Sequence, residues 1–399
     1  MSSHILQVYG ICLCTAILTF LFSSTLVRVF TPGRPIRRST VAAIRRLLGP
    51  PNPAIQGLLR TRAAANTRLQ DAFHLTNTFV SSSTTVHSDF LKQSSDLLRA
   101  SRKDWRGFAD VADQAVQLSL TNTPFHTFIR SVVLRTVIVG LLDPSTDITY
   151  LDAFDIDAAA ELMSDLWVRS KQPQPIPQEL LEKLNNHLRR LVPDEEKYPY
   201  PLDWVIPAWE TLWRVVAVTV AYVDQDVEAR DAFRSLVDKP TMATFRERRG
   251  ASSPSAQDYI DEGLRLHPPV KRITRHISRQ ALLTRFLPRS LAAYISRQTV
   301  VEVADIESAQ RDSTLWGPRP ANVYDPRRFV DAPGLAGNIL AFGYGPLQCK
   351  AAKEAPMAAA LIVGAILSRV KVVHGERVGG REAGSWRGWS VQRMDGDAT

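Results

Sequence analysis

The sequence predicts a mainly α-helical protein with a minor β-sheet, preceded by a single transmembrane helix. Three observations support this prediction. Residues 5–27 carry no charge, apolar residues recur at helical spacing from about residue 86 onward, and short β-prone pieces rich in proline follow residue 268. A chain of 399 residues without an internal repeat is long enough to bury a large core.

The first predicted element is a membrane anchor. Residues 5–27, ILQVYGICLCTAILTFLFSSTLV, form an uncharged run of 23 residues that can cross a bilayer as one helix. A cleaved signal peptide is the alternative, but no basic residue precedes the run and no small-x-small cleavage site stands out. We therefore assign residues 1–28 to a transmembrane anchor.

A basic block follows the anchor. Residues 28–68 contain nine arginines and no acidic residue, which places the following chain on the cytoplasmic side by the positive-inside rule. The net charge of +9 is compatible with nucleic acid, a membrane surface or an acidic partner. Because the block adjoins the anchor and lacks interleaved aromatic residues, we expect contact with membrane lipid and no nucleic-acid binding. Residues 29–64 are predicted to be a basic linker, and residues 65–399 the globular domain.

The globular part begins with a series of helices. Five amphipathic or buried helices are predicted at residues 89–101, 105–120, 125–143, 157–171 and 177–191. Residues 203–223 form a long apolar segment, whose internal Glu210 and Arg214 favour a buried core helix over a second membrane span. Another helix, DYIDEGLRLH, ends at Pro268, and the β-prone pieces KRITRHI and TVVEVAD follow it.

Cys349 is the only cysteine outside the predicted anchor, which excludes a disulfide framework. It follows a glycine-rich turn in AFGYGPLQCKA, residues 341–351. A lone cysteine is commonly a buried, inert thiol. Here Gly343 and Gly345 allow a tight turn and close approach to a flat ligand. A helix predicted from about Ala351 would direct its positive end at the sulfur and favour a thiolate.

The spacing F-x-x-G-x-x-x-C-x-A, from Phe342 to Ala351, resembles the haem-binding loop of the cytochrome P-450 superfamily. The resemblance implies that Phe342, Gly343, Gly345 and Cys349 bind the cofactor, with Cys349 as the axial ligand of the haem iron. The implied cofactor is haem b, iron protoporphyrin IX, held through the thiolate. The implied architecture is a cytochrome P-450-like fold.

Two further signatures stand in the family's order. EGLRLHPP places Glu262 and Arg265 three residues apart on one helix face, and WGPRPANVYDPRRF is similar to the segment that supplies Arg328. The resemblance implies that these three side chains form a buried charge network around the haem loop. An ordinary surface ion pair is the alternative for Glu262 and Arg265.

PAWETL, residues 207–212, is similar to the oxygen-binding segment of the same family. Pro207 would open a helical turn, and Glu210 and Thr211 would be the catalytic residues that relay protons during oxygen activation. The alternative is that Thr211 bonds its own helix and Glu210 pairs with Arg214 four residues later.

The sequence departs from the family at the positions that usually bind the haem propionates. Leu347 stands where an arginine or histidine is usual, and no W-x-x-x-R pattern occurs on the early helices. Arg272 and Arg275 are the candidates we name in their place, followed by His276 and His87. The N-terminal half is also shorter than expected for a membrane-anchored member.

The resemblance implies an enzyme, a haem-thiolate monooxygenase that oxidises a lipophilic small molecule. PAWETLWRVV and FGYGPLQC look most like segments of the membrane-anchored enzymes of fungal secondary metabolism, for example of terpenoid or polyketide pathways. The resemblance implies that the enzyme acts at the cytoplasmic face of the endoplasmic reticulum membrane. The sequence has no G-x-G-x-x-G or flavin motif, so no bound flavin or nicotinamide is expected. Electrons would come from an NADPH-dependent flavoprotein reductase docked near Lys350, Lys353 and Arg327.

Two alternatives stay open. The same fold could catalyse a reductase-independent isomerisation, dehydration or peroxide-driven reaction. It could also be a degenerate, non-catalytic relative that acts as a membrane-anchored partner.

Overall fold

The computed structural model describes residues 35–119, 123–278, 299–380 and 385–394. These residues divide into two units. The smaller comprises residues 1–37 and 274–303, and the larger comprises residues 38–273 and 304–399. The predicted anchor at residues 1–28 lies outside the described residues.

Apart from Pro35, the described residues of the smaller unit are strand residues. They belong to a three-stranded sheet of order β1-β3-β2, formed by β1 (Ile36–Arg38), β2 (Arg272–Ser278) and β3 (Thr299–Asp305). The two pieces that the sequence marks as β-prone, KRITRHI and TVVEVAD, are therefore strands. Their β-branched residues suit a pleated, half-buried surface.

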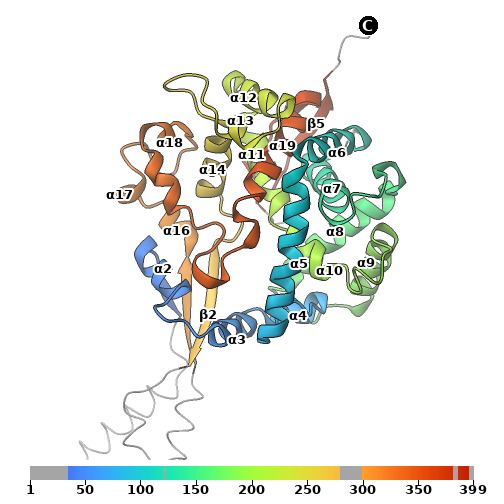
Figure 1. The fold of residues 1–399 in the computed structure, drawn as a ribbon, viewed down its shortest axis with the longest axis vertical. Coiled ribbons are helices and arrows are strands. Elements are labelled where there is room, and N and C mark those ends of the chain that lie inside the picture. The colour runs from blue at the N-terminus through green and yellow to red at the C-terminus, as the bar shows by residue number, and fades with distance from the viewer. Residues whose placement is uncertain (1–34, 120–122, 279–298, 381–384, 395–399) are drawn as a thin grey trace, which may run out of the picture. The chain divides into compact units, whose positions relative to one another are not determined.

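The larger unit is mainly helical (Figure 1). Its α-helices are α2 (Val41–Leu48), α3 (Ile55–Ala65), α4 (Thr67–Phe73), α5 (Thr84–Lys103), α6 (Trp105–Leu118), α7 (Phe125–Val137), α8 (Ala153–Arg169), α9 (Gln178–Leu191), α10 (Leu202–Trp209), α11 (Leu212–Val223), α12 (Val227–Asp238), α13 (Met242–Arg246), α14 (Ala256–Leu266), α16 (Ile306–Gln310), α17 (Ser313–Trp316), α18 (Arg327–Asp331) and α19 (Ala355–Arg369). A π-helical turn, Ile138–Leu142, extends α7. Strands β4 (Val370–Val373) and β5 (Ser390–Arg393) pair antiparallel, with Val372 opposite Val391.

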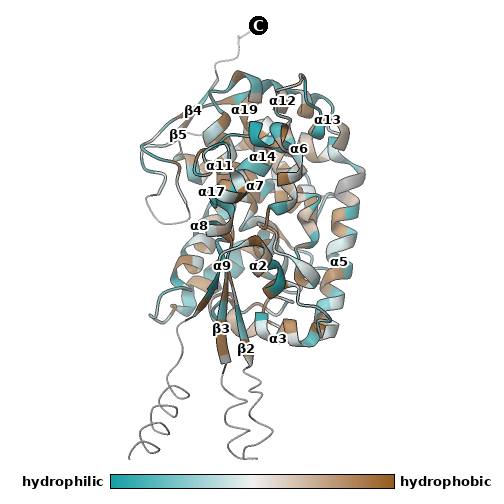
Figure 2. Cartoon of the chain, turned by 90° about the vertical axis from the view of Figure 1, so that its left-hand side faces the viewer, coloured by the Kyte–Doolittle hydropathy of each residue, from teal (hydrophilic) through white to brown (hydrophobic). Residues whose placement is uncertain are grey.

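The five helices predicted between residues 89 and 191 are all present, as α5 to α9. Side-chain caps fix several of their starts. Asp104 accepts a hydrogen bond from the Gly107 N–H at the start of α6, and Asp152 accepts one from the Asp155 N–H at the start of α8. Figure 2 shows hydrophilic and hydrophobic bands along α5, as expected for an amphipathic helix.

The stretch predicted to be a linker is largely folded. Within residues 29–64 it contains β1, α2 and most of α3, and Ile44, Leu48 and Leu59 are fully or almost fully buried. The arginines in this stretch favoured the interpretation as a lipid-contacting linker. In the structure, the apolar residues between the arginines form a face that packs into the core. Folded elements therefore begin well before residue 65.

Helix α19 lies in the core of the larger unit and packs against α6, α11, α12 and α14. It is apolar on all sides, as expected for a helix surrounded by others. A Cβ at Gly364 would lie 2.5 Å from Val237 Cγ2 and 3.1 Å from the Phe233 carbonyl, so this glycine permits the close approach of α12.

Residues Phe125–Leu142 form a helix long and apolar enough to span a membrane, but 72% of it is buried within the protein. Burial on this scale is typical of a core helix, and the helix packs against α6, α8 and α11.

Candidate functional site

Glu262, Arg265 and Arg328 form one buried cluster. Glu262 and Arg265 face each other from one side of α14, with Arg265 Nε and Nη2 donating to the carboxylate at 2.7 and 2.8 Å. Arg328, from α18, donates from Nε to both carboxylate oxygens at 3.0 and 3.1 Å. The exposed fractions of the three side chains are 0, 0 and 1%. The surface ion-pair alternative is thus not what the structure shows.

Backbone groups satisfy the rest of the cluster. The Asp325 N–H donates to Glu262 at 2.8 Å. Arg265 donates to the carbonyl oxygens of Gln310 and Ala321, both at 2.7 Å, and Arg328 donates to that of Trp316 at 2.7 Å. A buried charge cluster is tolerated only when its members are paired in this way. The cluster therefore fastens α14 to the segment that carries residues 310–328.

Gln310 extends this connection to the cysteine loop, and sequence reasoning missed it. Its side chain is fully buried and donates to the carbonyl oxygens of Leu264 and Arg265 at 2.8 Å. Its side-chain oxygen accepts a hydrogen bond from the Leu340 N–H at 2.7 Å, two residues before Phe342. A single glutamine in a short helix gives no pattern that would have marked it.

Arg45 supports the loop from α2. It donates to the Gly337 carbonyl at 2.7 Å and lies 5.4 Å from the centre of the Tyr344 ring. The sequence interpretation assigned this arginine to topology and lipid contact. The structure gives it a further contact, with the chain that precedes Cys349.

The loop around Cys349 depends on two glycines with left-handed backbone conformations. Gly343 and Gly345 both have φ of +74°. A Cβ at Gly345 would lie 2.7 Å from Gly49 Cα and 3.0 Å from the Leu48 carbonyl oxygen. The end of α2 therefore packs directly on the loop. The Cys349 N–H closes the loop by donating to the Phe342 carbonyl at 3.0 Å.

Cys349 has an exposed side chain and a raised pKa. Burial of its surroundings raises the pKa of the thiol, Glu354 adds to this, and a backbone hydrogen bond from Ala351 opposes it. The predicted helix starts later than expected: residues 350–352 form a 3-10 turn, and α19 begins at Ala355. The later start of α19 places its positive end further from the sulfur than expected, and a bound cation would stabilise the thiolate form.

The predicted long helix is interrupted at Glu210 and Thr211, between α10 and α11. Pro207 lies one turn earlier and has no N–H to bond the Asp203 carbonyl, which instead accepts a hydrogen bond from Asn77 Nδ2 at 2.8 Å. The sequence expectation of an opened turn in PAWETL agrees with this geometry.

Glu210 and Thr211 differ in their contacts. The buried Glu210 pairs with Arg214 at 2.9 Å, as one alternative anticipated. Arg214 also donates to the Pro269 carbonyl at 2.5 Å. Thr211 is partly exposed, and among the described residues its hydroxyl has no hydrogen-bond partner. The hydroxyl therefore does not bond its own helix.

The residues predicted to bind the haem propionates lie in different environments. Arg272, in the larger unit, is exposed and sits 3.7 Å from Asp305. Arg275, in the smaller unit, is buried, and burial lowers its pKa to about 10. Its Nη1 donates to the Thr274 carbonyl, and its Nε has no partner among the described residues. His276 is partly exposed.

His87 lies on α5, which packs against residues 350–352 beside Cys349. Its Nδ1 is 2.8 Å from the Thr78 hydroxyl, and Arg62 bonds the same hydroxyl. Burial lowers the pKa of His87, and Arg62 and Lys350 lower it further. Cationic groups therefore gather on this side of the loop. Leu347, partly exposed, offers none.

The residues named for a reductase surface are only partly available. Lys350 and Lys353 are exposed, and neither forms an ion pair within the described residues. Arg327 is already bound to Glu228 at 2.7 Å. The lysines thus remain candidates for docking, whereas Arg327 has a local partner.

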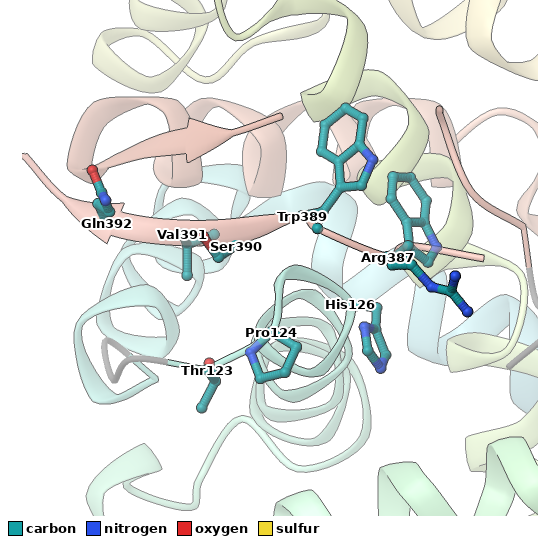
Figure 3. Close-up of a pocket in the computed structure, with 10 residues that line it drawn as sticks. Thr123, Pro124, His126, Arg387, Trp389, Ser390, Val391 and Gln392 are labelled. Carbon is teal, nitrogen blue, oxygen red and sulfur yellow. The ribbon is translucent and has the colours of Figure 1, made fainter. Parts of the chain in front are cut away.

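A pocket of about 640 Å³ opens where the start of α7 faces the segment before β5. Figure 3 shows Thr123 and Pro124 below the strand residues Ser390 and Val391, with His126 on the side of Arg387. The indole N–H groups of Trp386 and Trp389 bond backbone carbonyls. Burial, reinforced by Arg130, lowers the pKa of His126 to about 4, so its ring is neutral at pH 7. No sequence pattern indicated this pocket.

An exposed sulfur on a glycine loop, a charge cluster bracing that loop and a broken helix are features expected of a haem-thiolate protein. Residues 247–382 match the family model for cytochrome P450. They include Glu262, Arg265, Arg328 and Cys349. No curated protein matches the chain.

Among the solved structures that resemble the chain is CYP175A1 from Thermus thermophillus. It is 13% identical, with a TM-score of 0.53, and the likeness covers 90% of this chain and 89% of that one. At this identity the likeness shows the fold. The recognition from sequence is thus confirmed in its fold and in part of the chain: the chain has the cytochrome P450 fold, and its residues 247–382 match the cytochrome P450 family model.

The described residues fit a haem held through sulfur. Cys349 offers a soft donor with an exposed side chain, and the glycines keep side chains out of the turn before it. Elsewhere in the described part of the chain, no group of three or more His, Cys, Asp or Glu could hold a metal ion.

Proposed function

We propose that this protein is a haem-thiolate monooxygenase that oxidises a lipophilic small molecule in a secondary-metabolite pathway. Terpenoids and polyketides are the expected substrate families. Haem b would be held by Cys349, with Phe342, Gly343 and Gly345 shaping the loop and Arg272 and Arg275 as propionate partners. A thiolate-bound haem supplies oxygen activation and transfer of one oxygen atom.

The observation that supports oxygen activation is the unbonded Thr211 hydroxyl at the helix break, next to the buried Glu210. A hydroxyl that is free of its own helix can accept and donate a proton, and Glu210 can exchange protons with it or with water. We therefore favour the monooxygenase over the reductase-independent alternatives.

The chain's own residues supply positioning and protons. Glu262, Arg265, Arg328 and Gln310 hold the loop that presents Cys349. Arg214 keeps the Glu210 carboxylate at 2.9 Å and fixes its direction. Lys350 and Lys353 would receive an acidic NADPH-dependent flavoprotein reductase, and residues 1–28 would anchor the chain in the endoplasmic reticulum membrane with the haem domain in the cytoplasm.

The test is a difference spectrum of the reduced, carbon monoxide-treated protein. The wild type should show the Soret band of a thiolate-bound haem, and Cys349→Ala should lose it while still folding. Haem that fails to bind, or a band that persists in Cys349→Ala, would end the assignment and favour a non-catalytic relative. Consumption of NADPH in the presence of a reductase then separates the monooxygenase from peroxide-driven or isomerising relatives.

A further inference from the structure

An exposed loop joins α13 to α14. Residues 247–255, ERRGASSPS, are all described, and they belong to no helix or strand between the end of α13 at Arg246 and the start of α14 at Ala256. The side chains at residues 249–252 are exposed. Exposed loops of small and polar residues are the parts of a folded protein that other enzymes reach most readily.

The C-terminal end of this loop and the residue before its tip are fixed. Arg248 donates to the two carboxylate oxygens of Asp258, both at 2.9 Å, and to the Phe329 carbonyl at 3.0 Å. Ser255 is 2% exposed, and its hydroxyl caps α14 by accepting a hydrogen bond from the Asp258 N–H at 3.2 Å. Pro254 is buried as well. The exposed residues 249–252 are therefore held between two anchored positions.

Ser252 lies in this exposed part of the loop. Its side chain is exposed, and no residue in the described part of the chain hydrogen-bonds its hydroxyl. A single backbone bond is described within residues 249–253, from the Ser253 N–H to the Gly250 carbonyl at 3.3 Å. The hydroxyl can therefore react without breaking an internal hydrogen bond, and the loop can be extended on the surface of an enzyme at little cost.

Arginines precede Ser252 in the loop. Arg249 is three residues earlier, is exposed, and donates to the Ser235 hydroxyl on α12. Arg246, six residues earlier, is also exposed, and neither arginine pairs with a carboxylate among the described residues. Protein kinases select their substrates largely by the pattern of charges around the hydroxyl. An exposed arginine at the third position before a serine suits an acidic groove in such an enzyme.

Other serines and threonines of the described chain also have a basic residue three positions earlier, but they lie in helices, strands or a helix cap. They are Thr40, which caps α2, Ser95 in α5, Thr274 and Ser278 in β2, Thr314 in α17, and Ser390 in β5. The Ser95 hydroxyl donates to the Leu91 carbonyl at 2.6 Å, and that of Thr314 donates to Asp312 at 2.7 Å. Within the described chain, Ser252 alone combines this spacing with an exposed loop and a free hydroxyl.

We propose that Ser252 is a phosphorylation site for a serine/threonine protein kinase that recognises Arg249. The Ser252 Oγ attacks the γ-phosphorus of ATP, and a bond from Oγ to phosphorus forms as the bond to the oxygen bridging the β- and γ-phosphates breaks. ADP leaves, and the hydroxyl proton passes to the catalytic carboxylate of the kinase. This site goes beyond the proposed function and does not depend on it.

The modification would place a strong anion beside free cations. A phosphoserine carries a charge of about −1.5 to −2 at neutral pH. Arg249 could exchange its bond to the neutral Ser235 hydroxyl for a stronger, charge-assisted bond to the phosphate. The same arginine would thus be recognised by the kinase before the reaction and would hold the phosphate after it.

The experiment incubates the folded, full-length protein with ATP, Mg²⁺ and a calmodulin-dependent protein kinase, which selects arginine at the third position before the serine. Mass spectrometry of proteolytic peptides locates the phosphate. Ser252 should be modified about tenfold or more faster than Ser390, which has Arg387 at the same spacing but lies in β5, because a strand must open locally before it can bind. Synthetic peptides of residues 246–257 and 384–395 should be modified at similar rates, since neither is folded.

Four variants make the test specific. Ser252→Ala should lose the phosphate, whereas Ser253→Ala, at the next residue, should keep it. Arg249→Gln should be modified about tenfold or more slowly, and Arg234→Gln, which removes an exposed arginine on α12, should keep the wild-type rate. All four should unfold at the wild-type urea midpoint, because the changed side chains are on the surface. A slower reaction therefore reports recognition and not unfolding.

The inference is overturned if the kinase leaves Ser252 unmodified, if Ser390 in the folded protein reacts as fast as Ser252, or if Arg249→Gln reacts at the wild-type rate. Phosphate on Ser253 in place of Ser252 also overturns it and indicates a kinase that recognises Pro254. A further arm uses the chain purified from a eukaryotic host with phosphatase inhibitors present. Phosphate on Ser252 is expected there, and its absence would equally overturn the inference.

Discussion

The side-chain oxygen of Gln310 accepts a hydrogen bond of 2.7 Å from the Leu340 N–H, while its amide nitrogen donates to Leu264 and Arg265 carbonyls in α14. This one buried side chain therefore couples the helix that carries Glu262 to the loop that carries Cys349. The charge cluster and the cysteine loop are therefore connected by hydrogen bonds through Gln310.

We expect Gln310→Ala to loosen that loop. The substitution leaves the Leu340 N–H and two α14 carbonyls unsatisfied, and each unsatisfied buried group costs about 1–3 kcal/mol. The haem-to-protein ratio after purification should fall, together with the midpoint of urea unfolding. Gln70→Ala, at an exposed position of α4, is the matched control. Full haem retention in Gln310→Ala would show that the loop does not depend on this contact.

Glu262→Gln should be among the most destabilising single substitutions in the protein. The carboxylate is the only acidic partner of Arg265 and Arg328 among the described contacts. The side chains of these two arginines are 0 and 1% exposed, so the substitution leaves two buried cations unpaired. Breaking a buried pair in this way costs about 3–5 kcal/mol. Chemical unfolding measures the change, with the exposed Glu179→Gln as control. A loss under about 1 kcal/mol would mean that the cluster tolerates an amide.

Gly345→Ala tests the loop geometry directly. The residue has φ of +74°, and the new Cβ would lie 2.7 Å from Gly49 Cα, so both strain and collision follow. Strain of this kind costs about 1–3 kcal/mol before the collision is counted. Gly337→Ala, in the preceding turn, meets nothing within 4 Å and should retain haem normally. Equal haem content in the two variants would contradict the packing of α2 on the loop.

The parts of the site that the sequence could predict are those defined by local order. Glu262 and Arg265 share a helix face, Pro207 opens the helix one turn before Glu210, and the glycines precede Cys349 by fixed spacing. Gln310 and Arg45 could not be predicted, because their partners lie 30 and 292 residues away and depend on the complete fold.

In the fold as well, local patterns could be predicted from the sequence, whereas contacts between distant segments could not. Helical periodicity predicted α5 to α9, because each of these helices buries a face. The apolar run after Cys349 predicted a helix from about Ala351, and α19 begins at Ala355. Residues 29–64 were predicted to be a linker, because the arginines were given more weight than the helical spacing of Ile44, Leu48 and Leu59. Burial of those three side chains requires the partner segments, which a local pattern does not contain.

Asp261 should make stability depend on pH. Burial raises the pKa of its carboxyl to about 7; the Gln257 hydrogen bond opposes this, and the Asp258 and Glu262 carboxylates add to it. The folded state therefore holds a proton that the unfolded state, with a pKa of about 3.9, releases earlier. The free energy of unfolding should fall as the pH rises from about 4 to about 7, and should not change further from this group above that range.

Asp261→Asn should remove this part of the pH dependence and raise stability at pH 8 relative to the wild type. Unfolding at a series of pH values measures both effects, and Asp110→Asn, at an exposed position of α6, is the control. An unchanged slope between pH 4 and 7 in Asp261→Asn would show that other carboxyl groups cause it.

If Thr211 transfers protons during oxygen activation, Thr211→Ala should uncouple the consumption of electrons from the oxidation of the substrate. The described structure gives the hydroxyl no partner, so its removal breaks no internal hydrogen bond and should leave folding and the carbon monoxide spectrum unchanged. With a reductase present, the hydrogen peroxide released per NADPH should rise. Product formation should fall by about 10²-fold or more, the range of a lost general acid. Thr211→Ser keeps the hydroxyl and should stay close to the wild type. If Thr211→Ala and Thr211→Ser release peroxide equally, the hydroxyl has no part in proton transfer, and Glu210 with a bound water would be the remaining route.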